Sequence, residues 1–369
     1  MDEQRALGER VALARSAKGM SQGDLAAAVD LDRTALSKVE SGARRVTALE
    51  LARISGSLGR PLNWFLSNSP APILSRRAEM VRDQSPAELD AELTFEALAF
   101  EVQQLRDLGV LPAVAELLAV DVQIDSFGAA AEAALAARKH CSSVTEPLGS
   151  LASAAAAFGL HIYSLSLAGD VDGLMLHLGE GCGVCLVNGS ADPGRRRFTA
   201  AHELGHFLFD DEYSAEVMTA SNRSDREALI DYFAAHFLMP DPALRQSWAS
   251  RGGESDPRGA AVEIAAEYRV SWRSLLTRLV DSNLIDNDQR RELLPTPTKA
   301  DFLARRIQPP QADLQPPSVP PAVGEAILTA YYKDLITADR ALELLHGETD
   351  ALPAPELLPL RQLKGDFFE

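Results

Sequence analysis

The chain has 369 residues, 46% hydrophobic and 24% charged, a composition typical of a globular protein with two or three domains. No apolar run reaches the roughly eighteen residues that span a membrane, and the N-terminus does not resemble a secretion signal, so we expect a cytoplasmic protein without membrane insertion. The net charge of −17 excludes nonspecific nucleic-acid binding by the whole surface.

Residues 1–69 stand apart because they hold ten Lys and Arg residues against eight Asp and Glu residues. Ser21 followed by Asp24 marks a helix start, and four residues of turn lead to a second helix over 33–40. Helix, tight turn and helix within about twenty residues is the geometry that reads DNA, with the second helix in the major groove. The expected DNA contacts are Gln22, Arg33, Thr34, Ser37, Lys38, Arg44 and Arg45.

Residues 7–66, including the closing segment LELARISGSLGRPLNWFL, resemble the XRE-type helix-turn-helix domains of phage-like repressors. The resemblance implies a five-helix domain on double-stranded promoter or operator DNA. One departure is Asp30, which stands where the turn usually has glycine. Because Asp tolerates the left-handed conformation better than most residues, we expect the turn to be kept. The small positive excess leaves open a helical domain of this fold that binds protein instead.

Residues 70–130 are predicted as a helical linker. Ser85 and Glu88 form a capping box with Pro86 at the first helical position. Apolar side chains then recur every three or four residues as one stripe: Phe95, Leu98, Val102 and Leu105. The stripe packs either on its own domain or on a second copy. Because helix-turn-helix readers usually bind two half-sites as dimers, we predict a homodimer to which residues 85–118 contribute.

Residues 131–250 mix helix and strand. Three short, roughly alternating segments separated by Gly and Asp predict a small antiparallel meander: Leu160–Leu167, Gly173–Leu178 and Gly183–Asn188. Residues 251–308 look like a helical extension of the same domain. Residues 309–369 combine a proline-rich linker, Pro309–Pro321, expected not to fold, with a short helical stretch. The predicted architecture is therefore multidomain and mainly α, with one small sheet.

A His-Glu-x-x-His sequence occupies residues 202–206 within an apolar helical run. Four residues make about one helical turn, so His202 and His206 point the same way and can share one metal ion. Glu203 is rotated by about 100°, which places it beside the metal, where a carboxylate can take a proton from water. We therefore predict His202 and His206 as ligands and Glu203 as the catalytic base.

A second acidic pair follows about twenty residues later. Glu227 and Asp231 lie one turn apart on a predicted amphipathic helix, so they face the same direction. Glu227 can complete a His₂Glu site, and Asp231 can accept the remaining N–H of one imidazole. Zn²⁺ is the expected ion, although another divalent metal such as Mn²⁺ suits the same donors.

Other reactive side chains are weaker candidates. His236 falls on the opposite helix face from Glu227, and Cys182 and Cys185 lie in a strand-like segment, where alternation alone predicts one buried cysteine. With Cys141 they are too few for a disulfide framework. An electrophilic helper for the tetrahedral intermediate is expected, and the sequence does not choose among Arg195, Arg196, Arg197, Tyr213 and Tyr232.

The segments RRRFTAAHELGHFLF and EALIDYFAAHFLMP resemble the ImmA/IrrE metallopeptidases. Ile230 and Phe237 replace the usual alanine and leucine, and both stay apolar. The resemblance covers roughly residues 130–285. It implies a gluzincin-like α+β domain that cuts a specific repressor.

These patterns predict a DNA-bound zinc endopeptidase that cleaves a transcriptional repressor to start a stress or phage-defence response. The alternative is a transcription regulator whose peptidase-like domain senses a ligand or partner without proteolysis. An antitoxin-like binding protein has no support beyond the helix-turn-helix.

Overall fold

The computed structural model describes residues 3–66, 85–112, 124–179, 181–209, 220–309 and 312–353. The N-terminal part consists of short helices, as the sequence predicts: α1 (Glu3–Ala17), α2 (Gln22–Ala28), α3 (Arg33–Glu40), α4 (Ala48–Leu58) and α5 (Leu62–Leu66). Ser21 and Asp24 form the expected capping box of α2. Asp30 has a φ of 59°, so the left-handed turn before α3 is kept without glycine.

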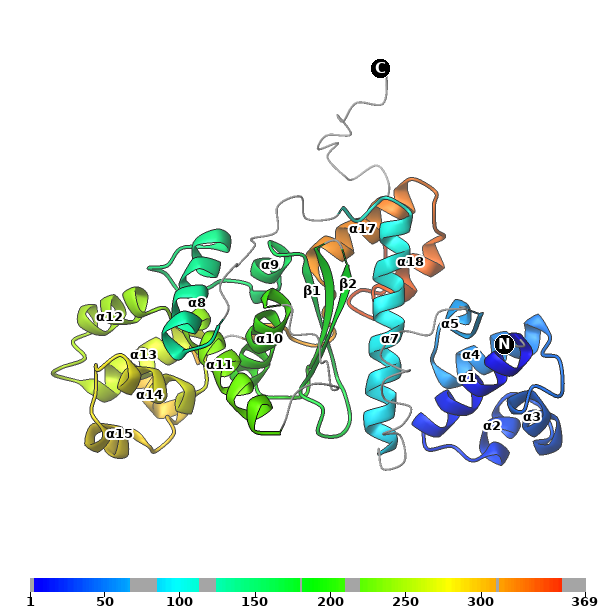
Figure 1. The fold of residues 1–369 in the computed structure, drawn as a ribbon, viewed down its shortest axis with the longest axis horizontal. Helices are drawn as coiled ribbons and strands as arrows, with labels where there is room; N and C mark the ends of the chain where they lie inside the picture. Colours follow the sequence, from blue (N-terminus) through cyan, green and yellow to red (C-terminus); the bar gives the residue numbers. More distant parts are fainter. Residues whose placement is uncertain are drawn as a thin grey trace, which may run out of the picture.

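Helix α7 (Pro86–Asp107) stands between the N-terminal helices and the remainder of the chain (Figure 1). Leu89, Leu93 and Ala97 on one side join the core of the N-terminal helices. The buried guanidinium of Arg60 strengthens this contact, because it donates to the Asp90 carboxylate at 2.6 Å. The other side of α7 packs on the sheet. α7 is thus a shared layer of two cores.

This arrangement corrects the prediction for the apolar stripe of α7. Phe95, Leu98, Val102 and Leu105 are at most 2% exposed, and they pack on the sheet and on the C-terminal helices of the same chain. A helical stripe shows that an apolar surface is covered, but it does not show what covers it. These side chains are therefore part of the core of a single chain and do not form an exposed surface.

The sheet contains β1 (Leu160–Leu165), β2 (Gly173–Gly179) and β3 (Cys182–Asn188) at the predicted places, but in the order β1-β3-β2. β1 pairs parallel to β3, and β2 pairs antiparallel to it, so the predicted antiparallel meander was wrong. The burial of the strands gives the reason. Every residue of β3 is buried, whereas β2 is half-exposed, and a continuously buried strand belongs in the centre of a sheet.

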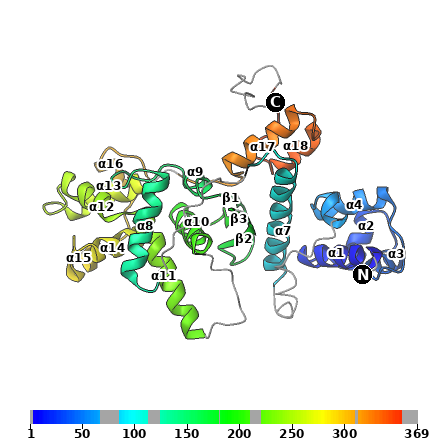
Figure 2. The same cartoon turned by 45° about the horizontal axis from the view of Figure 1, so that its top comes forward.

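Helices cover both faces of the sheet (Figure 2). Leu160, Ile162 and Cys185 face a large core that includes residues of the following helices: α8 (Phe127–Cys141), α9 (Leu151–Ala156), α10 (Pro193–Leu208), α11 (Ala220–Leu238), α12 (Asp241–Ser250), α13 (Pro257–Tyr268), α14 (Trp272–Asp281), α15 (Asn287–Leu293) and α16 (Lys299–Ala304). Because α13 and α14 share this core, residues 251–308 pack as an integral part of the predicted peptidase domain.

The proline-rich segment corrects a second prediction, because residues 312–320 pack against the domain. Ser318 forms a β-bridge with Ser164 of β1, and Leu314 and Val319 are buried. The Asp313 carboxylate binds the fully buried Arg197 of α10 and accepts from the Leu151 N–H at 3.1 Å. The segment then leads to α17 (Pro321–Tyr332) and α18 (Ala338–Leu344), which share the core of α7 and the sheet. Proline has no N–H to donate, but Asp313, Leu314, Ser318 and Val319 of this segment all form hydrogen bonds with other parts of the chain.

Candidate metal centre

Helix α10 sets the two histidines in line. It starts at Pro193, in the position where the missing N–H of proline costs nothing, and it runs without interruption through residues 202–206. One turn separates the two imidazoles, and their Nε2 atoms lie 3.0 Å apart. His206 is buried and His202 is half-buried, so one side of the pair is accessible.

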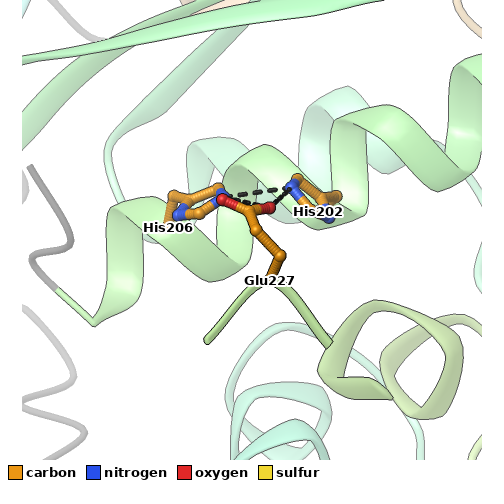
Figure 3. Close-up of side chains that lie close together, drawn as sticks. All are labelled: His202, His206 and Glu227. Carbon is orange, nitrogen blue, oxygen red and sulfur yellow. Dashed lines mark hydrogen bonds and ion pairs between the residues drawn. The ribbon is translucent and has the colours of Figure 1, made fainter. Parts of the chain in front are cut away.

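Helix α11 carries Glu227 to these histidines (Figure 3). The Glu227 Oε2 atom lies 3.2 Å from the His202 Nε2 and 3.6 Å from the His206 Nε2. Close packing of the two helices makes this possible. A Cβ built on Gly205 would lie 3.0 Å from the Phe233 ring, so glycine lets α11 approach α10 at the level of the site.

Asp231 lies one turn beyond Glu227 and contacts His202 at Nδ1, the ring nitrogen that does not face Glu227. Its Oδ1 lies 2.8 Å from the His202 Nδ1. Burial opposes a charge on this imidazole, but the hydrogen bond to Asp231 and the nearby carboxylates outweigh it and raise the pKa of His202. An N–H at Nδ1 leaves the lone pair of Nε2 directed toward Glu227 and His206.

The donor set fits a divalent metal ion. The ligand atoms of His202, His206 and Glu227 all lie within 4.8 Å of one another, and no other group of three such residues is found in the described part of the chain. Two imidazole nitrogens and a carboxylate oxygen directed at one point suit zinc, and three protein ligands leave a position open.

Glu203 lies on the sheet side of α10 and is 9% exposed. Burial raises the pKa of Glu203 to about 7; the adjacent His202 opposes this shift, and the Glu227 carboxylate adds to it. A carboxyl group with a pKa near neutrality is suited to exchanging protons with water and with an amine.

The structure separates the candidates for an electrophilic helper. Arg196 donates to the carbonyls of Gly189 and Ala191, and Arg197 to those of Leu148 and Gly149, so both arginines anchor loops.

Arg195 is exposed and pairs with Asp172 at 2.6 Å. Tyr232 packs against the rings of Phe127 and His236. Tyr213 lies outside the described residues. None of the described candidates donates a hydrogen bond to the histidine and glutamate cluster.

The remaining reactive residues serve packing. His236 is buried and its pKa is lowered to about 4 by burial and by Arg278. Cys182 belongs to the core on the α7 side of the sheet, whereas Cys185 belongs to the core on the α10 side. Side chains on opposite faces of a strand cannot form a shared redox or metal site.

The expected DNA contacts divide into two groups. Arg33, Thr34, Ser37 and Lys38 are all exposed on α3, as is Arg45 in the loop after it. α1 packs on α7, whereas α3 lies on the far side of the N-terminal helices in both views (Figures 1 and 2).

Gln22 and Arg44 form the second group, because both have partners inside the domain. Gln22 donates to the Glu40 carboxylate at 2.7 Å, and Glu40 also binds Arg15. Arg44 makes two hydrogen bonds to Glu50, which caps α4. Gln22 and Arg44 therefore support the fold of the N-terminal helices, a role that the sequence pattern did not indicate.

Two family models match the chain. One is described as an IrrE N-terminal-like domain and covers residues 155–280; the other is described as a helix-turn-helix and covers residues 11–65. The chain joins a helix-turn-helix to an IrrE-like domain. The expected pairing of a helix-turn-helix with an IrrE-like domain is therefore confirmed.

The chain is also similar to the radiation response metalloprotease IrrE of Deinococcus radiodurans. The two are 35% identical over 105 residues, which are 27% of this chain and 31% of that protein. The match thus spans about a third of the relative. Among the described residues, no helix is long and apolar enough to cross a membrane.

Proposed function

We propose that this chain is a metal-dependent, site-specific endopeptidase attached to a DNA-binding domain, and that it cleaves a transcriptional repressor in the cytoplasm to switch on a stress or phage-defence response. One observation carries the enzymatic part: His202, His206 and Glu227 converge beside the buried carboxyl group of Glu203. This arrangement is the one required for hydrolysis with a metal and a general base.

Each residue has a distinct role in the proposed reaction. His202, His206 and Glu227 would hold a divalent ion, with zinc the preferred one, which polarises a peptide carbonyl and acidifies water when bound. Glu203 accepts the proton of the attacking water and passes it to the leaving amine. Asp231 fixes the orientation of the His202 ring through Nδ1.

The position of β2 supports an extended peptide as the substrate. Within the described residues β2 pairs with β3 alone, and its first residue contacts Glu203. An edge strand beside α10 can pair with an extended chain through backbone groups that face away from β3. This favours cleavage inside a polypeptide.

The substrate class rests on the domain pairing. A helix that presents Arg33, Thr34, Ser37 and Lys38 away from the peptidase can occupy a promoter and bring the protease to a repressor bound there. The similar protein of Deinococcus radiodurans is a radiation response metalloprotease, which supports a stress response as the trigger. Two half-sites on DNA would call for a homodimer, formed through a surface other than the α7 stripe.

A sensor without proteolysis is the second candidate. The observation in its favour is α7, whose two sides contact both the DNA-binding core and the sheet next to the metal centre. A ligand at the metal centre could therefore change the orientation of the N-terminal helix-turn-helix without any bond being cut.

Glu203→Gln distinguishes the two candidates, because glutamine keeps the shape of the side chain and removes the base. We expect this variant to keep its metal and its DNA binding but to lose the cellular response. A full response from Glu203→Gln would favour the sensor and contradict the peptidase.

A further inference from the structure

Gly173, the first residue of β2, lies directly against the catalytic helix. A Cβ built on it would lie 2.6 Å from the Thr199 Cγ2 and 2.9 Å from the Glu203 Oε1. Gly173 is not among the glycines with a positive φ, so its backbone conformation is open to any residue. Glycine is therefore required here because there is no room for a Cβ atom, and not because of the backbone conformation.

The two neighbours differ in how easily they yield. Thr199 is β-branched and sits on a helix, which restricts its χ1 angle. Glu203 has a longer, unbranched side chain, and the torsion that turns its terminal carboxylate has broad energy wells. A methyl group at residue 173 would therefore displace the carboxylate of Glu203 before it displaced Thr199.

The chain around Gly173 is held at this distance from α10. The Asn188 N–H donates to the carbonyl of Asp172 at 2.9 Å, and the Arg195 guanidinium donates to the Asp172 carboxylate at 2.6 Å. Arg195 belongs to α10, the helix that carries Glu203. The start of β2 is thus tied both to β3 and to the catalytic helix.

We propose that Gly173 is a positioning residue: by lacking a side chain, it leaves the space in which the Glu203 carboxylate stands. The link to catalysis rests on the proposed role of Glu203 as the base. The contact itself does not depend on that role, so it can be tested on unfolding as well as on hydrolysis.

A double-mutant cycle on urea unfolding is the deciding test. Gly173→Ala is introduced into the wild type and into Glu203→Ala, in which the contacted carboxylate is gone. The proposal predicts a clearly smaller drop of the unfolding midpoint in Glu203→Ala than in the wild type. Equal drops in both backgrounds overturn it. If Gly173→Ala alone does not fold, all variants of the cycle are made in a Thr199→Ser background, which removes the tightest contact of the added methyl group.

Metal content and rate show the consequence for the site. Gly173→Ala should retain as much zinc as the wild type, because it touches no ligand. Its kcat should fall about 100-fold with little change in KM, as expected for a catalytic group displaced by about 1 Å. Adding Thr199→Ser should restore part of kcat. Gly128→Ala is the control, since a Cβ there meets nothing within 4 Å.

The outcomes separate this proposal from the proposed function. A wild type that cleaves nothing, combined with unequal drops of the unfolding midpoint, contradicts the peptidase and supports the contact. A wild type that cleaves a repressor, combined with equal drops, supports the peptidase and overturns the role of Gly173.

Discussion

The candidate metal centre and the proposed DNA-reading face both arise from residues spaced along helices, but the side chains of the two regions are held in different ways. At the metal centre, side chains from α10 and α11 converge in a half-buried position and contact one another. On α3, the exposed side chains point to solvent, and two of the residues expected beside them are bound within the domain. The ligands of the proposed metal site all come from one chain, whereas the exposed side chains of α3 are proposed to acquire their partners on DNA.

The largest expected effect is at the metal centre. Glu227→Ala removes one of three ligands, and two histidines alone make a weak site. We expect the metal content of the purified protein to fall from about one ion per chain to nearly none, measured by elemental analysis. Glu132→Ala on α8 is the matched control, because Glu132 is exposed and outside the cluster. Full occupancy in Glu227→Ala would remove Glu227 from the ligand set.

The second largest effect is expected at the ion pair that anchors α10, the helix that carries both histidines. Asp313→Ala leaves the fully buried guanidinium of Arg197 without its carboxylate. Loss of one partner of a buried ion pair destabilises a protein by roughly 3–5 kcal/mol. The exposed pair of Arg5 and Glu9 on α1 is the comparison, because Glu9→Ala should lower the free energy of unfolding by about 0.5 kcal/mol or less. Thermal unfolding of the two variants measures the difference, and similar melting temperatures would show that the C-terminal segment does not support α10.

The sequence predicted those parts of each site that depend on the spacing of residues along one helix. His202, His206, Glu227 and Asp231 repeat at one helical turn, so their common direction follows from helix geometry. Asp313 and Gly173 meet α10 only through the fold, and no local pattern marks them. The apolar stripe of α7 and the strand alternation predicted the elements correctly but not their neighbours, because periodicity gives a buried face without its partner.

The reading face should show smaller and separable effects. Arg33→Ala or Lys38→Ala should weaken binding to a specific promoter site by about 1–3 kcal/mol for a base contact and less for a phosphate contact, and should leave the metal content unchanged. Gln22→Ala should mainly lower stability, since Gln22 is bound to Glu40. Titration of promoter DNA at two salt concentrations checks both expectations. If Gln22→Ala reduced DNA affinity most, the division between reading and supporting residues would be wrong.

The central claim is that the centre formed by His202, His206 and Glu227 hydrolyses a protein. The most direct measurement is mass spectrometry of a repressor-like protein encoded beside this chain, after incubation with zinc-loaded, chelator-treated and zinc-restored enzyme. The account predicts cleavage at one bond, its loss after chelation and its return with zinc. An intact repressor in all three samples, or cleavage that persists without metal, would contradict it.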